Sequence, residues 1–239
     1  MSRVARIVVP GFAHHITQRG NRKSDVFETD DDRLAYLRFL RQYAAKHNLS
    51  IYAYCLMTNH IHLVAVPGDE LALGHALRDA HTVYAMYFNT RTQLTGHVWQ
   101  GRFYSCPLDE AHLWAAVRYV ERNPVVAGLV ERAEQYRWSS AAAHCQLCAD
   151  DLLCPDFPPE GIIEDWSAWL FQPNEESVAA YIRKQTQTGR PCGSELFLTQ
   201  LEGLLRRPVR RQKPGRKPKR KKPPKAQHDS KNSENVINA

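Results

Sequence analysis

The sequence lacks the long apolar segments of membrane and secreted proteins. No apolar run approaches the roughly 18 residues that a transmembrane helix needs. The N-terminus has no apolar core of the signal-peptide kind, and no internal repeat is visible. We therefore expect a cytoplasmic protein without a membrane partner. Its 239 residues suffice for one good hydrophobic core and a small appendage.

Cysteine is sparse and is not arranged as a disulfide framework. In a reducing compartment we expect all six cysteines to be free thiols. They are Cys55, Cys106, Cys145, Cys148, Cys154 and Cys192. Cys145-x-x-Cys148 has no matching second pair at standard zinc-site spacing. A small zinc site that adds Cys154 and His144 is the alternative.

Acidic residues are absent from a stretch near the C-terminus. Residues 206–225 hold twelve of the 32 Lys and Arg residues, and the remaining 20 face 25 acidic residues. Proline and charge density oppose packing, so we expect a disordered basic tail over 206–239 that binds phosphates in a salt-sensitive way. Its Pro-Gly-Arg-Lys-Pro core is weakly similar to an AT-hook, but we prefer a generic nucleic-acid-binding or solubilising tail. The expected DNA contacts there are Arg210, Arg211, Arg216 and Lys217.

Two histidines stand two residues apart in the apolar run 57–66. The β-prone stretches Ser50–Met57 and His60–Val66, separated by Thr58-Asn59, predict a hairpin. Because side chains alternate along a strand, His60 and His62 share one face. Two imidazoles held so close supply half of a metal site. Alone, the pair is more typical of ordinary hydrogen-bonded histidines.

A second segment, about sixty residues on, predicts a helix that begins at Asp109. Asp109 is a suitable N-cap, and Pro124 marks the end of the helix. Tyr119 and Asn123 are four residues apart, so they share a face beside the apolar stripe. A tyrosine in such a position is usually a packing residue.

Two imidazoles, an amide and a phenol together suit phosphodiester chemistry. A tyrosine hydroxyl is a weak nucleophile near neutral pH, because its pKa is about 10. A divalent cation can compensate by polarising the scissile phosphate and orienting it for in-line attack. The product would be a covalent phosphotyrosine.

The order of predicted elements indicates an α+β fold. A strand within residues 3–18 is followed by a basic loop, a helix over Asp31–His47 and the histidine hairpin. A helix over Leu71–Leu94, a strand over Trp99–Pro107 and the tyrosine helix complete a βαββαβ-like order with an antiparallel sheet. Helices over Asp165–Phe171, Glu175–Gln187 and Ser194–Arg206 then predict a small helical extension.

Five motifs in order resemble the single-tyrosine HUH transposases, and among them the REP-associated tyrosine transposases, which are domesticated bacterial relatives of insertion-sequence transposases. They are HHITQRGNRKSDVF (14–27), NHIHLV (59–64), GHVWQGRFYS (96–105), RYVERNPVVAGLV (118–130) and YRWSSAAAH (136–144). The resemblance covers about residues 3–145. It implies a ferredoxin-like sandwich with the histidines on the sheet and the tyrosine on a facing helix. We assign residues 1–148 to this catalytic domain, 149–205 to the helical extension and 206–239 to the tail.

The resemblance also implies roles for the site residues. His60 and His62 match the metal-binding histidines, and Tyr119 matches the nucleophile. Asn123 stands where many relatives have a glutamine ligand; being shorter, it either ligates the metal or acts through water or on Tyr119. The implied cofactor is Mg²⁺ or Mn²⁺, and the implied partner is single-stranded or hairpin DNA of palindromic repeats. A bacterial, nucleoid-associated protein follows, either monomeric or homodimeric.

Further DNA contacts are expected from basic and aromatic residues other than the metal-binding and nucleophilic ones. Arg19, Arg22, Lys23 and Arg102 suit phosphate clamping. Trp99, Phe103 and Tyr104 are candidates for base stacking, although each alone is more typical of a structural role. The other histidines are interpreted as structural or solvent-facing, with His112 expected to lie nearest the site; they are His14, His15, His75, His81, His97 and His112.

Three functions compete at this point. The preferred one is a metal-dependent endonuclease and strand transferase that forms a 5′-phosphotyrosine link. The second is a DNA-binding regulator of the same fold that is catalytically weak. The third is a metal-dependent hydrolase without a covalent intermediate, for which Tyr119 would be dispensable.

Overall fold

The core of the protein is a four-stranded antiparallel sheet. In the computed structural model, which describes residues 6–159, 161–173 and 175–210, the strands are β1 (His14–Arg19), β2 (Leu49–Met57), β3 (His60–Pro67) and β4 (Tyr104–Pro107). Their order is β2-β3-β1-β4, and all neighbours pair antiparallel. The central strands are therefore β1 and β3, and β3 carries the histidine pair.

The predicted hairpin is confirmed. β2 and β3 are joined by Thr58 and Asn59 alone, and Met57 pairs with His60 across the turn. Both faces of β3 are covered, since every residue from Ile61 to Ala65 is buried. This explains why the run is apolar at consecutive positions apart from its histidines.

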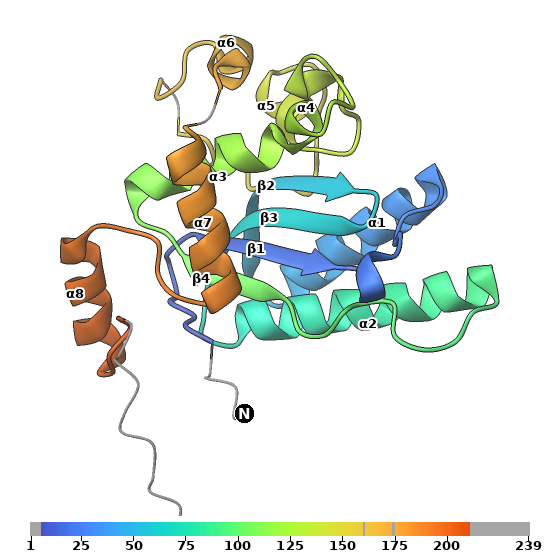
Figure 1. Ribbon diagram of the computed structural model, residues 1–239, viewed down its shortest axis with the longest axis horizontal. Helices are drawn as coiled ribbons and strands as arrows, with labels where there is room; N and C mark the ends of the chain where they lie inside the picture. The colour runs from blue at the N-terminus through green and yellow to red at the C-terminus, as the bar shows by residue number, and fades with distance from the viewer. Residues whose placement is uncertain (1–5, 160, 174, 211–239) are drawn as a thin grey trace, which may run out of the picture.

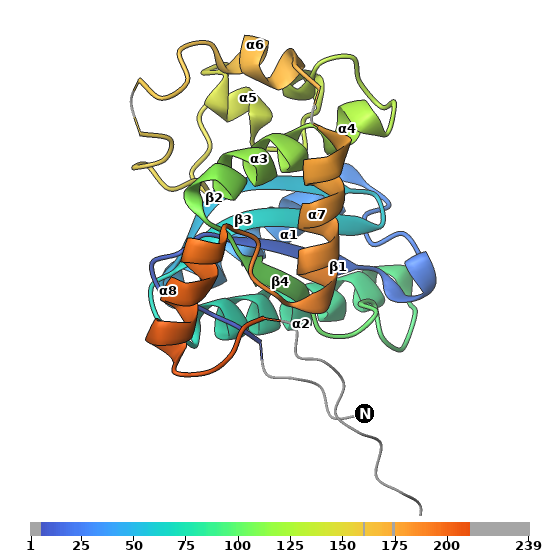
Figure 2. The same ribbon diagram turned by 60° about the vertical axis from the view of Figure 1, so that its left-hand side comes forward.

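Helices α1 (Asp30–Lys46) and α2 (Ala72–Thr92) cover one face of the sheet, as Figures 1 and 2 show. Their apolar sides bury Leu40, Leu77 and Tyr84 against Ile16 and Leu63 of the sheet. A capping box at Thr29 starts α1, and its partner carboxylate belongs to Asp32. The βαββαβ order with strands 2-3-1-4 is the ferredoxin-like α+β arrangement that was predicted.

Helices α3 (Glu110–Glu121) and α7 (Glu176–Thr188) cover the other face (Figure 2). Asp109 caps α3 by accepting from the His112 N–H, as predicted. Pro124 lies in the first turn of the short helix α4 (Asn123–Val126), where its missing N–H costs nothing. Shorter elements complete the chain between these helices: η1 (Asn21–Lys23), η2 (Ala133–Gln135), α5 (Ala141–His144) and α6 (Trp166–Phe171).

A buried carboxylate ties α3 to the segments that follow it. Glu121, at the end of α3, is fully buried. It accepts from Ser140 Oγ at 2.5 Å, His144 Nδ1 at 2.6 Å and Trp166 Nε1 at 2.9 Å. Burial of a carboxylate is tolerated only when its oxygens are satisfied in this way. We call these four residues the Glu121 clamp; it joins α3 to α5 and α6.

The last described helix, α8 (Glu195–Leu205), packs its Phe197 and Leu201 on Ile7 and Val9 near the N-terminus. Ser194 is its N-cap. Although α7 follows residue 148, it packs on β4, α3 and β1. The division at 148/149 stays a prediction, and the tail beyond residue 210 lies outside the described residues.

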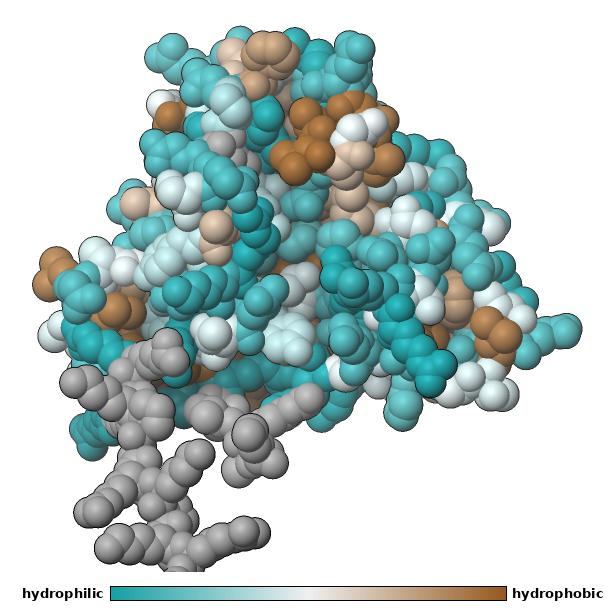
Figure 3. Space-filling view, in the orientation of Figure 1, coloured by the Kyte–Doolittle hydropathy of each residue, from teal (hydrophilic) through white to brown (hydrophobic). Residues whose placement is uncertain are grey.

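The surface is mostly polar in the view of Figure 3. Apolar side chains gather there over the α4 region, where Val126 and Leu129 are exposed. None of the described helices is long and apolar enough to cross a membrane.

Candidate functional site

His60 and His62 lie side by side on the face of the sheet that α3 covers. Their ring centroids are 5.0 Å apart, with the rings nearly perpendicular. His62 is buried, whereas His60, at the start of β3, is half-buried. The predicted shared face is therefore found, and the open side of the pair is at His60.

Helix α3 brings Tyr119 onto this histidine pair. The Tyr119 ring centroid is 5.4 Å from that of His62, in an edge-to-face contact. One turn later, the Asn123 amide nitrogen donates to the Tyr119 carbonyl oxygen at 2.9 Å. The amide NH₂ is thus engaged, and Oδ1 is the end that remains for a cation or a donor. His60, His62 and Tyr119 are thus brought together, and Asn123 lies next to Tyr119.

His15, which the sequence suggested to be structural or solvent-facing, is buried and also contacts this site. It lies on β1 opposite Val64, and its ring stacks on His62 at 5.2 Å and meets Tyr119 edge-on at 5.7 Å. His112 is not near the site; it pairs with Asp109 at 2.6 Å and contacts Tyr181. The strand alternation that placed His60 and His62 could not rank His15 against His14, because the pairing partner of β1 was unknown.

A chain of hydrogen bonds fixes which nitrogen of His62 is free. The Thr186 hydroxyl donates to the Ile182 carbonyl at 2.8 Å, so it can only accept from His15 Nδ1–H at 2.7 Å. His15 Nε2 then carries a lone pair and accepts from His62 Nδ1–H at 3.0 Å. His62 Nε2 is left unprotonated, which is the form that binds a metal.

His60 is set in the same tautomer by a different neighbour. The Asn59 amide nitrogen donates to the Lys23 carbonyl at 3.2 Å, which turns Asn59 Oδ1 toward His60 Nδ1 at 2.7 Å. His60 Nδ1 is therefore the protonated nitrogen, and Nε2 carries the lone pair. Both imidazoles therefore present an unprotonated Nε2, which is the form that can ligate a metal.

The donor set fits a divalent cation that takes further ligands from elsewhere. Within residues 6–159, 161–173 and 175–210, no group of three or more His, Cys, Asp or Glu side chains is arranged to hold a metal. His60 and His62 would therefore need Asn123 and oxygen atoms of water or substrate to complete a coordination shell. An open shell of this kind suits catalysis better than a structural site.

Burial keeps the two imidazoles neutral. It lowers the pKa of His60 to about 4, with a further contribution from the Arg19 guanidinium, and it lowers the pKa of His62 well below its usual value. Burial also raises the pKa of Tyr119, while the nearby Arg183 guanidinium on α7 opposes that shift. Tyr119 is therefore a neutral phenol near pH 7, and Arg183 is placed to stabilise its phenolate.

Acid should unfold this protein because several other histidines are buried in the neutral form. Burial lowers the pKa of His14 to about 4, and those of His15 and His81 to about 3. Below the unfolded-state value of about 6.5 the unfolded chain binds more protons, so stability falls by up to about 1.4 kcal/mol per pH unit for each histidine down to these pKa values. Urea unfolding at pH 7.5 and pH 5 should show a clear drop in midpoint. His81→Gln should reduce that drop and exposed His97→Gln should not; equal midpoints at both pH values would contradict this explanation.

The His15 relay predicts a metal defect from a residue that does not reach the metal. Thr186→Val removes the acceptor that fixes His15, whereas Thr186→Ser keeps the hydroxyl. We expect Thr186→Val and His15→Phe to weaken Mn²⁺ binding about 10- to 100-fold, with Thr186→Ser close to the unaltered protein. Calorimetric titration with Mn²⁺ measures this. Equal Mn²⁺ affinities for Thr186→Val and Thr186→Ser would show that the hydrogen bond from His15 to Thr186 does not support metal binding.

The basic residues expected to contact DNA fall into separate places. Arg19 pairs in register with His60, and Arg22 and Lys23 follow in η1, so these three border the histidine pair. Arg102 is exposed beside β4, two residues after Gln100, whose N–H donates to the Arg19 carbonyl. Arg210 bonds to Glu195 and Glu202, which staples it to α8. Arg211, Arg216 and Lys217 lie outside the described residues.

The aromatic candidates also differ in exposure. Trp99 and Phe103 are buried, and Trp99 Nε1 donates to the His81 carbonyl, so both are core residues. Tyr104 is 47% exposed and is the one of the three that can stack on a base. The alternative zinc site is not found, because in the part of the chain that the structure describes His144 and the cysteines form no group of three or more ligands that could hold a metal.

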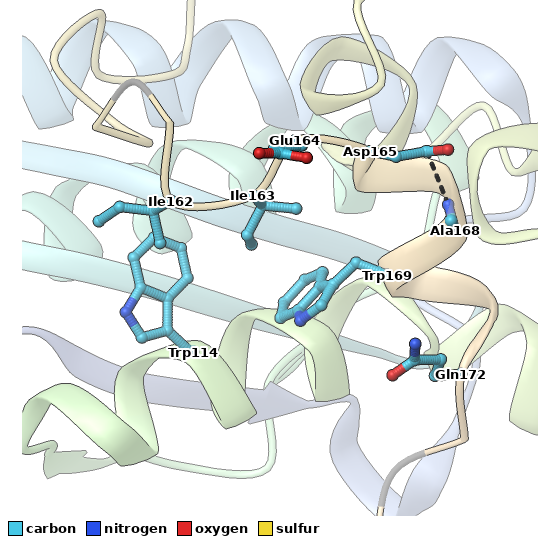
Figure 4. A pocket seen from close by; sticks show the side chains of 8 residues that line it. All are labelled: Trp114, Ile162, Ile163, Glu164, Asp165, Ala168, Trp169 and Gln172. Carbon is cyan, nitrogen blue, oxygen red and sulfur yellow. Dashed lines mark hydrogen bonds between the residues drawn. The ribbon is translucent and has the colours of Figure 1, made fainter.

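A hollow of about 430 Å³ lies between α3 and the segment around α6 (Figure 4). The Trp114 and Trp169 indoles line it from two sides, and Ile162 and Ile163 lie along the loop above them. Glu164 and Asp165 also line it, and the Asp165 carboxylate accepts from the Ala168 N–H as the N-cap of α6. Two carboxylates at the rim disfavour a phosphate there. This hollow is not part of the histidine–tyrosine site.

Comparison with known proteins points to one family. Residues 8–123 match the family model described as "Transposase IS200 like". A solved REP-associated tyrosine transposase bound to a REP hairpin is 20% identical, covering 65% of this chain and 93% of its own with a TM-score of 0.45. A crystal structure of a protein from Deinococcus radiodurans, proposed to be a transposase, is 15% identical, covering 51% of this chain and 97% of its own with a TM-score of 0.36. A comparison with curated proteins gives no match.

Proposed function

We propose that this chain, whose residues 8–123 match the IS200-like transposase family model, cleaves and rejoins single-stranded or hairpin DNA through a covalent phosphotyrosine. The observation that carries the proposal is the Tyr119 ring, whose centroid lies 5.4 Å from that of His62, one of two neighbouring imidazoles. A phenol beside two prepared metal ligands is the minimum set for this chemistry.

We assign the metal ligands to His60 and His62, with the Asn123 Oδ1 as the third protein donor. The cation, Mg²⁺ or Mn²⁺, would act as a Lewis acid on the scissile phosphate when bound. The protein's own contribution is to hold both imidazoles as neutral Nε2 donors, through His15 and Thr186 on one side and Asn59 on the other. Arg19, Arg22 and Lys23 border the same opening and would clamp the phosphates on either side of the cut.

The reaction exchanges one ester for another. Tyr119 Oη loses its proton and forms a bond to phosphorus, while the bond from phosphorus to the 3′-oxygen breaks and that oxygen takes up a proton. The products are a 5′-phosphotyrosine and a free 3′-hydroxyl, so no external energy source is required. Attack by another 3′-hydroxyl reverses the sequence and rejoins the strand. Arg183 would stabilise the Tyr119 phenolate that is released when the rejoining 3′-hydroxyl displaces it from phosphorus.

The motifs at residues 14–27, 59–64, 96–105, 118–130 and 136–144 support palindromic repeat hairpins as the substrate class. A hairpin offers a folded stem for recognition beside an unpaired cleavage point. A catalytically weak DNA-binding protein remains the second candidate, favoured by asparagine rather than the longer glutamine at position 123.

One experiment separates the candidates. A fluorescent hairpin oligonucleotide with a single-stranded flank is incubated with the protein and Mn²⁺, then run on a denaturing gel. A denaturation-resistant protein–DNA adduct supports the tyrosine transferase. Cleavage without an adduct supports a hydrolase, and binding without cleavage supports the regulator. EDTA is the matched control, because it should abolish the adduct without altering the DNA.

A further inference from the structure

A basic groove runs along β4, which is an edge strand of the sheet. The cavity has a volume of about 630 Å³ and lies between β4, the end of α7, the segment before β1 and the residues after α8. Five arginines line it: Arg6, Arg102, Arg190, Arg207 and Arg210. No carboxylate is among its lining residues. We call this cavity the β4 groove.

Two buried polar atoms in the β4 groove have no partner. Ser105 is 3% exposed, and its Oγ makes no hydrogen bond within the described part of the chain. The same holds for Arg190 Nη1, and both residues line the groove. A buried donor without an acceptor costs about 1–3 kcal/mol, more when it is charged. A hydroxyl and a guanidinium nitrogen that lack partners at the wall of one cavity are the complement of an anionic oxygen.

The other arginines define the field of the groove. The Arg6 guanidinium lies 3.7 Å over the Phe103 ring and donates to the Phe103 carbonyl, and Arg207 donates to the Arg6 carbonyl. The Arg207 bond goes to a neutral carbonyl oxygen and leaves the Arg207 charge in place. Arg210 is different, because Glu195 and Glu202 neutralise it. The carboxyl end of α7 also attracts cations, yet Arg190 Nη1 makes no hydrogen bond to its carbonyls.

The groove adjoins the histidine–tyrosine site. Thr186 lines the groove, and the same hydroxyl accepts from His15 Nδ1 at 2.7 Å. Tyr104 also lines the groove, with 47% of its surface exposed. Cations that follow a backbone, together with an open aromatic ring, are the usual components of a single-strand binding site.

We propose that the β4 groove binds the sugar–phosphate backbone of a single-stranded DNA segment that continues into the tyrosine site. Ser105 Oγ and the Arg190 guanidinium hold one phosphate, and Tyr104 stacks on an adjoining base. This deepens the proposed function and rests on it for the identity of the nucleic acid. It assigns the unpaired flank, rather than the hairpin stem, to this edge of the sheet.

The test measures binding apart from chemistry. Binding of unpaired oligonucleotides is measured in the presence of EDTA by fluorescence anisotropy, at several salt concentrations. We expect Arg190→Gln to weaken binding about tenfold and to reduce the magnitude of the salt slope by about 0.7, the value for one phosphate contact on a single strand. Ser105→Ala should weaken binding without changing the slope, and Tyr104→Ala should weaken it about tenfold through lost stacking.

The controls are chosen by charge and fold. Arg38→Gln removes an exposed arginine on α1 and should leave both affinity and slope unchanged. Arg190→Lys keeps the charge and should restore the slope, and thermal unfolding of each variant checks that it folds. Unchanged affinity in folded Arg190→Gln and Ser105→Ala overturns the groove, as does a loss confined to a duplex of equal length. If these variants weaken DNA binding while the unaltered protein forms no covalent adduct, the β4 groove is supported as a DNA-binding site and the proposed transferase activity is contradicted.

Discussion

Tyr119→Phe should fold and bind hairpin DNA like the unaltered protein, but it should form no covalent adduct and cleave at least about a thousandfold more slowly. The substitution removes one oxygen and keeps the ring that contacts His15 and His62. The Tyr119 side chain is half-buried, and Tyr104, the alternative tyrosine nucleophile, lies on the edge strand β4. Adduct formation on a denaturing gel and single-turnover cleavage rates measure the effect.

The matched control is Tyr104→Phe, which makes the same chemical change at an exposed ring. It should form adduct at the normal rate, since stacking needs only the ring. If the adduct persists in Tyr119→Phe and disappears in Tyr104→Phe, the nucleophile is Tyr104 on β4. Undiminished cleavage by Tyr119→Phe without any adduct would instead make water the attacking group.

His62→Ala should abolish metal-dependent cleavage and weaken Mn²⁺ binding by at least about 100-fold. It removes one of the two imidazoles assigned as metal ligands. It also removes the hydrogen bond between His62 Nδ1 and His15 Nε2. His60→Ala should do the same to activity while costing less stability, because His60 is only half-buried. Calorimetric titration with Mn²⁺ on the Tyr119→Phe background keeps the DNA intact during the measurement.

His97→Ala is the control for a surface histidine. It should leave Mn²⁺ affinity and cleavage unchanged. A double variant lacking both His60 and His62 that still binds Mn²⁺ normally in the presence of DNA would rule out the assigned ligands and point to the DNA as the whole metal site.

The elements near the site were largely predictable because their signals are local. Alternation along a strand placed His60 beside His62, and an N-cap with a following apolar stripe placed Tyr119 on a helix, while Asn123 begins the next short helix, α4. The helix bounds from Asp165 onward also agree within a residue or two. These patterns depend only on neighbours within one or two turns.

The contributions of His15, Thr186 and Arg183 were not predictable from such patterns. His15 and Thr186 bond across 171 residues of sequence, and the pairing depends on β1 lying beside β3 and on α7 returning to the sheet. The β4 groove has the same origin, because Ser105 and Arg190 meet only after α7 has packed on β4. Helical periodicity in 176–188 indicates that α7 has a buried face, not what that face covers.

The Glu121 clamp bears on whether Tyr119 and the histidine pair of one site come from the same copy of the chain or from two copies. Its three hydrogen bonds fasten the end of α3 two residues after Tyr119, and the histidines that meet the ring belong to the same polypeptide. Exchanging α3 alone between two copies, without α5 and α6, would leave a buried carboxylate without its donors. In this arrangement the tyrosine and the histidine pair come from one polypeptide, so the proposed cut would be made in cis.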